Sequence, residues 1–186
     1  MFAITPRLVL RPGWPEDAAA LARAIGHESV VRHLARAPWP YAIGDAEAFL
    51  SLPRDAHEPR FQICTRSGNY RLIGGIGLMR VGTATGGETW ELGYWLAPEA
   101  WGLGYATEAG RAVIDIARHA LGLARIVARH HVDNPASGHV LAKLGFAATG
   151  TGETYSLARG EAVACIEHEL CLRPDIVPCG NVPLAA

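Results

Sequence analysis

The fold of this chain is decided by the stretch from Trp90 to Ala109, which reads WELGYWLAPEAWGLGYATEA. Its first part, as far as Leu96, alternates in the manner of a strand, and Pro98 interrupts that pattern. From Tyr105 onward, apolar residues recur every three or four positions, as on one face of a helix. The stretch therefore predicts a strand, a glycine-bearing turn and the start of a helix.

The turn at residues 101–106 has a composition that favours a bound anion. Gly102 and Gly104 keep side chains away from the backbone, and the first N–H groups of the following helix lack intrahelical partners. A phosphate or pyrophosphate binds well at such a place, although a tight connection without a ligand would explain the glycines too. Two known nucleotide-binding motifs do not fit this turn. A dinucleotide-binding fingerprint would need glycine or alanine where the chain has Thr107, and a P-loop would need a Gly-Lys-Ser/Thr sequence, which is absent.

The remaining elements follow from apolar periodicity on either side of this stretch. Before it we predict a strand at 7–11, helices at 15–26, 29–36 and 45–52 (the last capped by Asp45), and strands at 61–65 and 72–79 with a glycine-rich connection at 82–87. After it we predict a strand at 125–130, a helix capped by Asn134, and strands at 147–156 and 161–172. The pattern is typical of an α/β (α+β) fold with a mixed sheet flanked by helices.

Length and composition indicate a single folded unit. The 186 residues are 49% apolar and 19% charged, so a sizeable core is expected, and we predict one domain at 1–172 with a loose tail at 173–186. A net charge of −1 gives no electrostatic reason to expect nucleic acid. No segment has the apolar length of a membrane span, and residues 1–12 lack the apolar stretch of a signal peptide, so we expect a cytoplasmic protein.

Two motifs, taken together, point to one family. The first joins Glu91–Leu96 (ELGYWL) to Trp101–Ala109 (WGLGYATEA), and the second joins Asn134–Ser137 (NPAS) to Leu141–Phe146 (LAKLGF). This pair resembles the acetyl-CoA-binding core of the GNAT acyltransferases, most closely the RimJ/RimL branch of protein N-terminal acetyltransferases. The resemblance extends over residues 5–172, and the pair of motifs is more specific than either one alone.

The resemblance implies a fold and a donor site. The fold would be a mostly antiparallel sheet of six or seven strands with a V-shaped opening between the central strands, where the pantetheine arm lies along exposed backbone. The implied donor is acetyl-CoA, without a metal. The family positions that would bind it are Tyr94, Trp95, Leu96, Trp101, Gly102, Leu103, Gly104, Tyr105, Ala106, Thr107, Asn134, Ser137 and Lys143.

One position departs from the RimJ/RimL pattern, because the phosphate loop of that branch often carries a basic residue where this chain has Leu103. Phosphate binding would then depend on backbone N–H groups, with Arg111 or Lys143 as helpers. Lys143 would fit a solvated helix position equally well.

The implied reaction is acetyl transfer from a thioester to an amine. It needs a neutral amine, a stabilised oxyanion and a proton for the departing thiolate. An α-amine titrates near about 8 and a lysine near about 10.4, so an α-amine needs only a modest base. Glu91 is the candidate base, although a carboxylate paired with a neighbouring arginine is a close alternative. Ser137 is the candidate acid for the thiolate, unless it is only a first-turn residue of the helix capped by Asn134. Tyr155 is a rival acid, and the Leu96 N–H is the candidate oxyanion donor.

The segment His130-His131-Val132-Asp133 raises the question of a metal site. Neighbouring histidines on a strand point to opposite faces, and the sequence shows no evident third ligand. We therefore expect no metal, and direct transfer in a ternary complex without an acyl-enzyme.

The leading hypothesis is an acetyl-CoA-dependent N-acetyltransferase that acts on a primary amine, most directly a protein or peptide N-terminus. A small-molecule amine, such as a polyamine, an amino sugar or an amino acid analogue, is an alternative acceptor. From other classes, a non-catalytic acyl-CoA-binding sensor and a nucleotide-binding module are alternatives. Neither nucleic acid nor membrane is an expected partner, and the sequence leaves the acceptor and a homodimeric state open.

Overall fold

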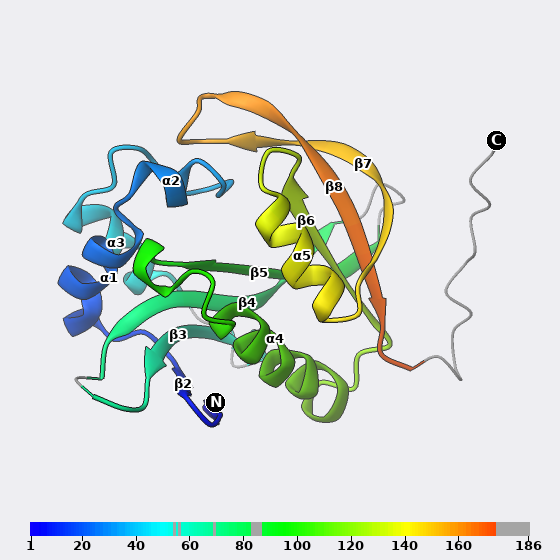
Figure 1. The fold of residues 1–186 in the computed structure, drawn as a ribbon, viewed down its shortest axis with the longest axis horizontal. Helices are drawn as coiled ribbons and strands as arrows, with labels where there is room; N and C mark the ends of the chain where they lie inside the picture. The colour runs from blue at the N-terminus through cyan, green and yellow to red at the C-terminus, as the bar shows by residue number, and fades with distance from the viewer. Residues whose placement is uncertain (54, 56, 69, 83–86, 174–186) are drawn as a thin grey trace.

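The computed structural model describes residues 1–53, 55, 57–68, 70–82 and 87–173, which form one eight-stranded sheet with helices on both faces (Figure 1). The strand order is β1-β2-β3-β4-β5-β6-β8-β7, and the described neighbours are antiparallel except for the parallel pair β5 and β6. The predicted mixed, mostly antiparallel sheet is thus confirmed. The sheet exceeds the expected six or seven strands because β1 has only two residues, too few to give an alternating pattern.

The elements before the opening of the sheet are β1 (Ala3–Ile4), β2 (Leu8–Arg11), η1 (Pro15–Asp17), α1 (Ala18–Ile25), α2 (Glu28–Val31), α3 (Ile43–Ser51), β3 (Arg60–Thr65), β4 (Leu72–Gly82) and β5 (Glu88–Leu96). The elements after it are η2 (Pro98–Ala100), α4 (Tyr105–Asp115), η3 (Ile116–Ala120), β6 (Arg125–His131), α5 (Pro135–Lys143), β7 (Ala147–Ser156) and β8 (Glu161–Cys171).

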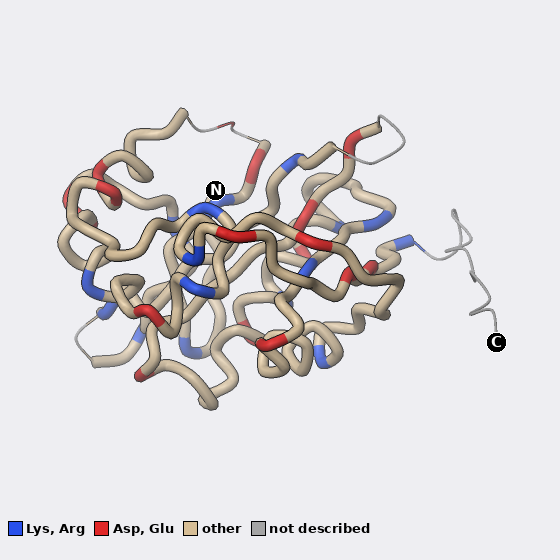
Figure 2. Tube along the Cα trace, turned by 90° about the horizontal axis from the view of Figure 1, so that it is seen from above, with Lys and Arg blue, Asp and Glu red and all other residues tan. Residues whose placement is uncertain are grey.

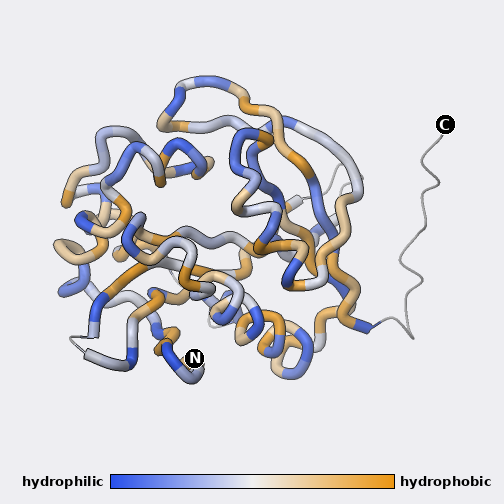
Figure 3. The backbone as a smooth tube through the Cα atoms, viewed as in Figure 1, coloured by the Kyte–Doolittle hydropathy of each residue, from blue (hydrophilic) through white to orange (hydrophobic). Residues whose placement is uncertain are grey.

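Two apolar clusters hold the helices to opposite faces of the sheet. The larger one packs α4 and α5 against the strands, and it includes the fully buried Val113 and Leu141 together with Leu92. The smaller one joins α1, α2 and α3, and the partly buried Trp95 packs against it. Figure 3 shows the corresponding alternation of apolar and polar residues along α4. In the part of the chain that the structure describes, no helix has the length and apolar character needed to cross a membrane.

The opening in the sheet lies between β5 and β6, which diverge visibly in Figure 1. Their parallel pairing covers Glu91 with Val127 and Leu92 with Ala128, and β5 continues beyond it to Leu96. This is the V-shaped opening that the resemblance implied. The rest of β5 is paired with β4 alone, so one edge of its backbone faces the opening.

Hydrogen bonding decides which backbone groups face that opening. The Ala97 N–H donates to the Ile73 carbonyl at 2.8 Å, on the β4 side of the chain. Because backbone groups alternate between the two edges of an antiparallel strand, those of Trp95 also face β4. The N–H and C=O of Tyr94 and Leu96 therefore face the opening.

Two predicted helix boundaries were wrong for identifiable reasons. Asp45 does not cap α3 from outside: the helix begins at Ile43, and the Asp45 carboxylate accepts a hydrogen bond from the Ala42 N–H at 2.8 Å. The helix predicted at 29–36 ends at Val31. The next carbonyls accept from the β7–β8 hairpin instead, as the Leu157 N–H donates to Ala35 at 3.0 Å. The predicted connection at 82–87 and the predicted tail at 173–186 lie largely outside the described residues, which omit 83–86 and 174–186.

A cavity-creating substitution tests the larger cluster. Leu78 on β4 is 1% exposed, so we expect Leu78→Ala to lower the free energy of unfolding by about 2–5 kcal/mol through lost burial and a residual cavity. The exposed Leu52 is the control, and Leu52→Ala should change it by less than about 0.5 kcal/mol. Urea denaturation measures both, and equal effects would contradict the assigned core.

Candidate active site

The open edge of β5 presents backbone groups to an extended ligand. One of them is already used, because the Trp101 indole N–H donates to the Leu96 carbonyl at 2.8 Å. The N–H and C=O of Tyr94 and the N–H of Leu96 remain on the side of the opening. An extended molecule could add along this edge as a further strand does. Sequence reasoning placed Trp101 in the phosphate turn and missed its link to Leu96.

The turn after β5 has the strand-turn-helix form that the sequence predicts. Gly102 and Gly104 have φ values of 73° and 78°, in the left-handed region that favours glycine. Gly104 is the N-cap of α4, and its carbonyl accepts from the Glu108 N–H at 3.0 Å. The N–H groups of the first turn consequently point out of the helix end without intrahelical partners. Such a backbone arrangement suits an anion.

A pocket of about 620 Å³ lies against this helix end. The turn between β1 and β2 forms one wall, and the first turns of α4 form another. It brings together Gly104 and Thr107 with the helpers Arg111 and Lys143, all of which the sequence had suggested. It also includes Arg7, which the sequence reasoning missed.

Ser137 lies in the first turn of α5 and contacts the central strand. Its N–H donates to the Asn134 side chain at 3.3 Å, so Asn134 caps this helix as predicted. The Tyr94 hydroxyl donates to the Ser137 carbonyl at 3.0 Å and lies 2.8 Å from the Ser137 Oγ. Either hydroxyl can be the donor in this contact, and where Tyr94 donates, the serine proton stays available for another acceptor. Burial, partly countered by this contact, raises the pKa of Tyr94 to about 12.

Glu91 lies on the other face of the sheet from this pair. Strand alternation places it on the side of α1 to α3, whereas Tyr94 packs with the α4 and α5 cluster. Burial raises the pKa of Glu91, although nearby Arg129 and Arg36 act to lower it. The Arg129 Nε lies 3.9 Å from the carboxylate and 3.8 Å from that of Glu167. The arginine pairing considered from the sequence is thus present, at long range.

Tyr155 is an exposed residue that does not share hydrogen bonds with the other candidate catalytic groups in the described residues. It occupies β7 opposite Ala162 of β8, and its side chain is 58% exposed. Within the described residues, no hydrogen bond links it to Ser137 or Tyr94.

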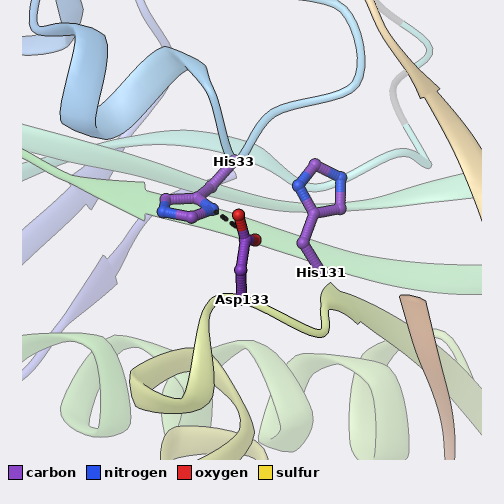
Figure 4. Close-up of side chains that lie close together, drawn as sticks. All are labelled: His33, His131 and Asp133. Carbon is purple, nitrogen blue, oxygen red and sulfur yellow. Dashed lines mark ion pairs between the residues drawn. The ribbon is translucent and has the colours of Figure 1, made fainter. Parts of the chain in front are cut away.

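Three polar side chains from two segments that are distant in the sequence meet at the end of β6 (Figure 4). The potential ligand atoms of His33, His131 and Asp133 all lie within 4.8 Å of one another. His33 is the third group that sequence reasoning did not find, because it comes from the segment after α2. Asp133 is already shared by two guanidinium groups, Arg159 at 2.9 Å and Arg32 at 3.4 Å, so we describe the cluster as an ion-pair network.

The two adjacent histidines of β6 point to opposite faces, as the strand period requires. His130 pairs with His168 on β8 at 2.9 Å between ring nitrogens, while His131 stacks obliquely near His33. Burial lowers the pKa of all four imidazoles. Neutral rings are therefore expected at pH 7. Along the Cα trace, basic and acidic residues are interspersed (Figure 2).

Comparisons with known proteins agree with this geometry. The family described as an acetyltransferase (GNAT) domain matches residues 7–147. The uncharacterized N-acetyltransferase YoaA of Bacillus subtilis (strain 168) is 33% identical over 165 residues, covering 86% of this chain and 92% of that protein.

Two solved structures have a similar fold. The ribosomal-protein-S5-alanine acetyltransferase of Vibrio fischeri aligns with a TM-score of 0.76 and 20% identity, over 96% of this chain and 100% of that one. The spermidine N-acetyltransferase of Vibrio cholerae, solved with CoA and spermine, aligns with a TM-score of 0.73 and 20% identity, over 90% and 97% of the two chains. At these identities the likeness concerns the fold, and acceptors differ between the two proteins.

The left-handed backbone at the turn yields a stability prediction. We expect Gly104→Ala to destabilise the fold by about 1–2 kcal/mol, because a Cβ is strained at that φ. Gly44 inside α3 is the matched control: a Cβ there meets no atom within 4 Å, and Gly44→Ala should stabilise by about 0.4–1 kcal/mol. Chemical denaturation of both variants measures the change in the free energy of unfolding. A Gly104→Ala variant as stable as the wild type would refute the argument from strain.

Proposed function

This chain belongs to the GNAT acetyltransferase family, and on that premise we propose that it moves the acetyl group of acetyl-CoA to the α-amine of a protein or peptide N-terminus. The family assignment makes it an acyltransferase of the N-acetyltransferase type. This assignment argues against a non-catalytic acyl-CoA-binding sensor. The identity of the acetyl donor and that of the acceptor amine are what we propose here.

The residues present fit a CoA thioester as donor. The free N–H and C=O of Tyr94 suit a pantetheine arm, and the positive-φ turn at Gly102 and Gly104 suits a pyrophosphate. The cations Arg111 and Lys143 in the adjoining pocket suit further phosphate charge. When bound, the donor supplies an activated acyl group with a thiolate leaving group.

Ser137 supports this proposal from the α5 face of the opening. Its hydroxyl contacts the Tyr94 hydroxyl at 2.8 Å, so the two groups form a short polar chain beside the open strand. We assign Ser137 the role of protonating or hydrogen-bonding the departing thiolate. Tyr94, with its pKa raised by burial, keeps its proton at neutral pH and holds the serine in place. Tyr155 stays a rival acid.

The position and burial of Glu91 are the main support for the proposed reaction. It is a half-buried carboxylate on the face opposite Ser137, so base and acid would act from two sides of one opening. Burial raises its pKa, which makes it a stronger base than an exposed carboxylate. The Leu96 N–H faces the opening and is our candidate donor to the oxyanion.

The pKa of the acceptor amine favours an α-amine. An α-amine releases its proton near about 8, within reach of a modest base, whereas a lysine amine requires about 10.4. Arg129 and Arg36 act to lower the pKa of Glu91 and Glu167 acts to raise it, so the charges beside this carboxylate are of both signs. The proposed preference for a peptide N-terminus therefore rests on the lower pKa of its amine. Other small amines are outcomes of the acceptor assay below.

Substitution of the two candidate catalytic residues tests the mechanism. We expect Glu91→Gln to lower kcat by about 100-fold or more and Ser137→Ala by a smaller factor, with CoA binding retained in both. The wild-type rate should rise with pH through the pKa of Glu91 and again toward about 8 as the α-amine loses its proton. Glu91→Gln should lack the first rise.

The control carries the same change on the same strand. Glu88 is exposed at the start of β5, and Glu88→Gln should leave kcat unchanged. Calorimetric titration with CoA and thiol release against N-terminal peptides, polyamines and amino sugars provide the readouts. Full activity in Glu91→Gln would remove it as the base, and thiol release only with a small amine would overturn the proposed acceptor.

A further inference from the structure

We propose that Arg7, from the turn between β1 and β2, completes the binding site for the donor's pyrophosphate. The inference rests on the proposed function, since it concerns the same donor site. The loop at residues 101–106 contains no basic side chain, so its own charge comes only from backbone dipoles. A cationic side chain from another part of the fold would add the positive charge that the loop needs to bind a pyrophosphate more tightly.

Arg7 is held in place by Glu108 in the first turn of α4. Its Nε lies 2.6 Å from one carboxylate oxygen, and its backbone N–H donates to the other at 2.9 Å. The Thr5 hydroxyl donates to that second oxygen at 2.6 Å. Burial acts to raise the pKa of Glu108, but these hydrogen bonds outweigh it and lower the pKa. The carboxylate is therefore ionised at neutral pH and fixes the guanidinium.

The rest of the guanidinium faces the glycine loop. Its Nη1 donates to the Leu103 carbonyl at 2.9 Å, and the group lies over the Tyr105 ring at 4.6 Å from the ring centre. Its Nη2 lies 3.5 Å from the place that a Cβ on Gly104 would occupy. The charged end of Arg7 is thus directly beside the N-terminus of α4. With 48% of its side chain exposed, it is accessible to a ligand.

The surrounding charges leave room for an anion. Arg7 lines the same 620 Å³ pocket as Arg111 and Lys143, so three cations from three segments share it. Among the described residues, neither Arg111 nor Lys143 has an ion-pair partner. The pocket also holds two carboxylates, Glu108, which pairs with Arg7, and Asp115, which lies 3.9 Å from Arg118, so its cations outnumber its acids. Because Arg7 is the cation bonded to the loop itself, we assign it to the pyrophosphate.

Binding of CoA and of dephospho-CoA, which keeps the pyrophosphate but lacks the 3′-phosphate, tests this assignment. We expect Arg7→Met to weaken both ligands by about tenfold or more in calorimetric titration, the loss of one charge-assisted contact. Arg7→Lys should show a smaller loss, because it keeps the charge without the fork. The dissociation constant of Arg7→Met should also depend less on salt than that of the wild type.

Arg66 provides the matched control. It anchors the same N-terminal segment by donating to the Thr5 carbonyl at 2.8 Å, but it does not line the pocket. Arg66→Met should bind both ligands like the wild type. The inference is overturned if Arg7→Met also binds like the wild type, if it loses affinity for CoA alone, or if its salt dependence is unchanged. If the wild type binds neither ligand, the proposed donor fails as well.

Discussion

Two residue pairs, Glu91 with Val127 and Leu92 with Ala128, join the two halves of the described sheet in parallel. Beyond them β5 keeps β4 as a neighbour but loses β6, so its backbone alternation directs the polar groups of Tyr94 and Leu96 into the opening. Backbone groups left without partners are costly unless water or a ligand satisfies them. The early end of this ladder therefore creates both the opening and the reason for an extended molecule to occupy it.

The strand period divides the chemistry between the two faces of that opening. Tyr94 faces α5 and meets Ser137, while Glu91 faces the helices that precede β3. A raised pKa in the folded state means that the contribution of Glu91 to stability is fully present below its unfolded pKa of about 4.3 and is lost as pH rises through the folded pKa. Once ionised, the half-buried carboxylate is destabilising, and Arg129 offsets part of that cost.

Long-range ion pairs close the two ends of the site. At the donor end, Glu108 holds Arg7 against the glycine loop. At the other end, Asp133 draws Arg32 and Arg159 together, and the Arg159 Nε donates to the Arg32 carbonyl at 2.8 Å. The β7–β8 hairpin is thereby attached to the segment after α2. Both ion pairs reinforce apolar contacts between the same parts of the chain, because Leu34 and Ala158 pack against the smaller cluster and Leu8 lies in the larger one with Ala106.

The sequence by itself determined the order of nearly all elements and the family, because these depend on local features: the alternation from Trp90 to Leu96, the glycines at 102 and 104, and the Asn134 cap. It could not determine which edge of β5 is free, since that depends on where β6 departs. Nor could it bring Arg7 to Glu108 or His33 to Asp133, each pair about a hundred residues apart. Those contacts were decided by the tertiary structure, because only packing of the sheet and helices overcomes the entropy of closing such long loops.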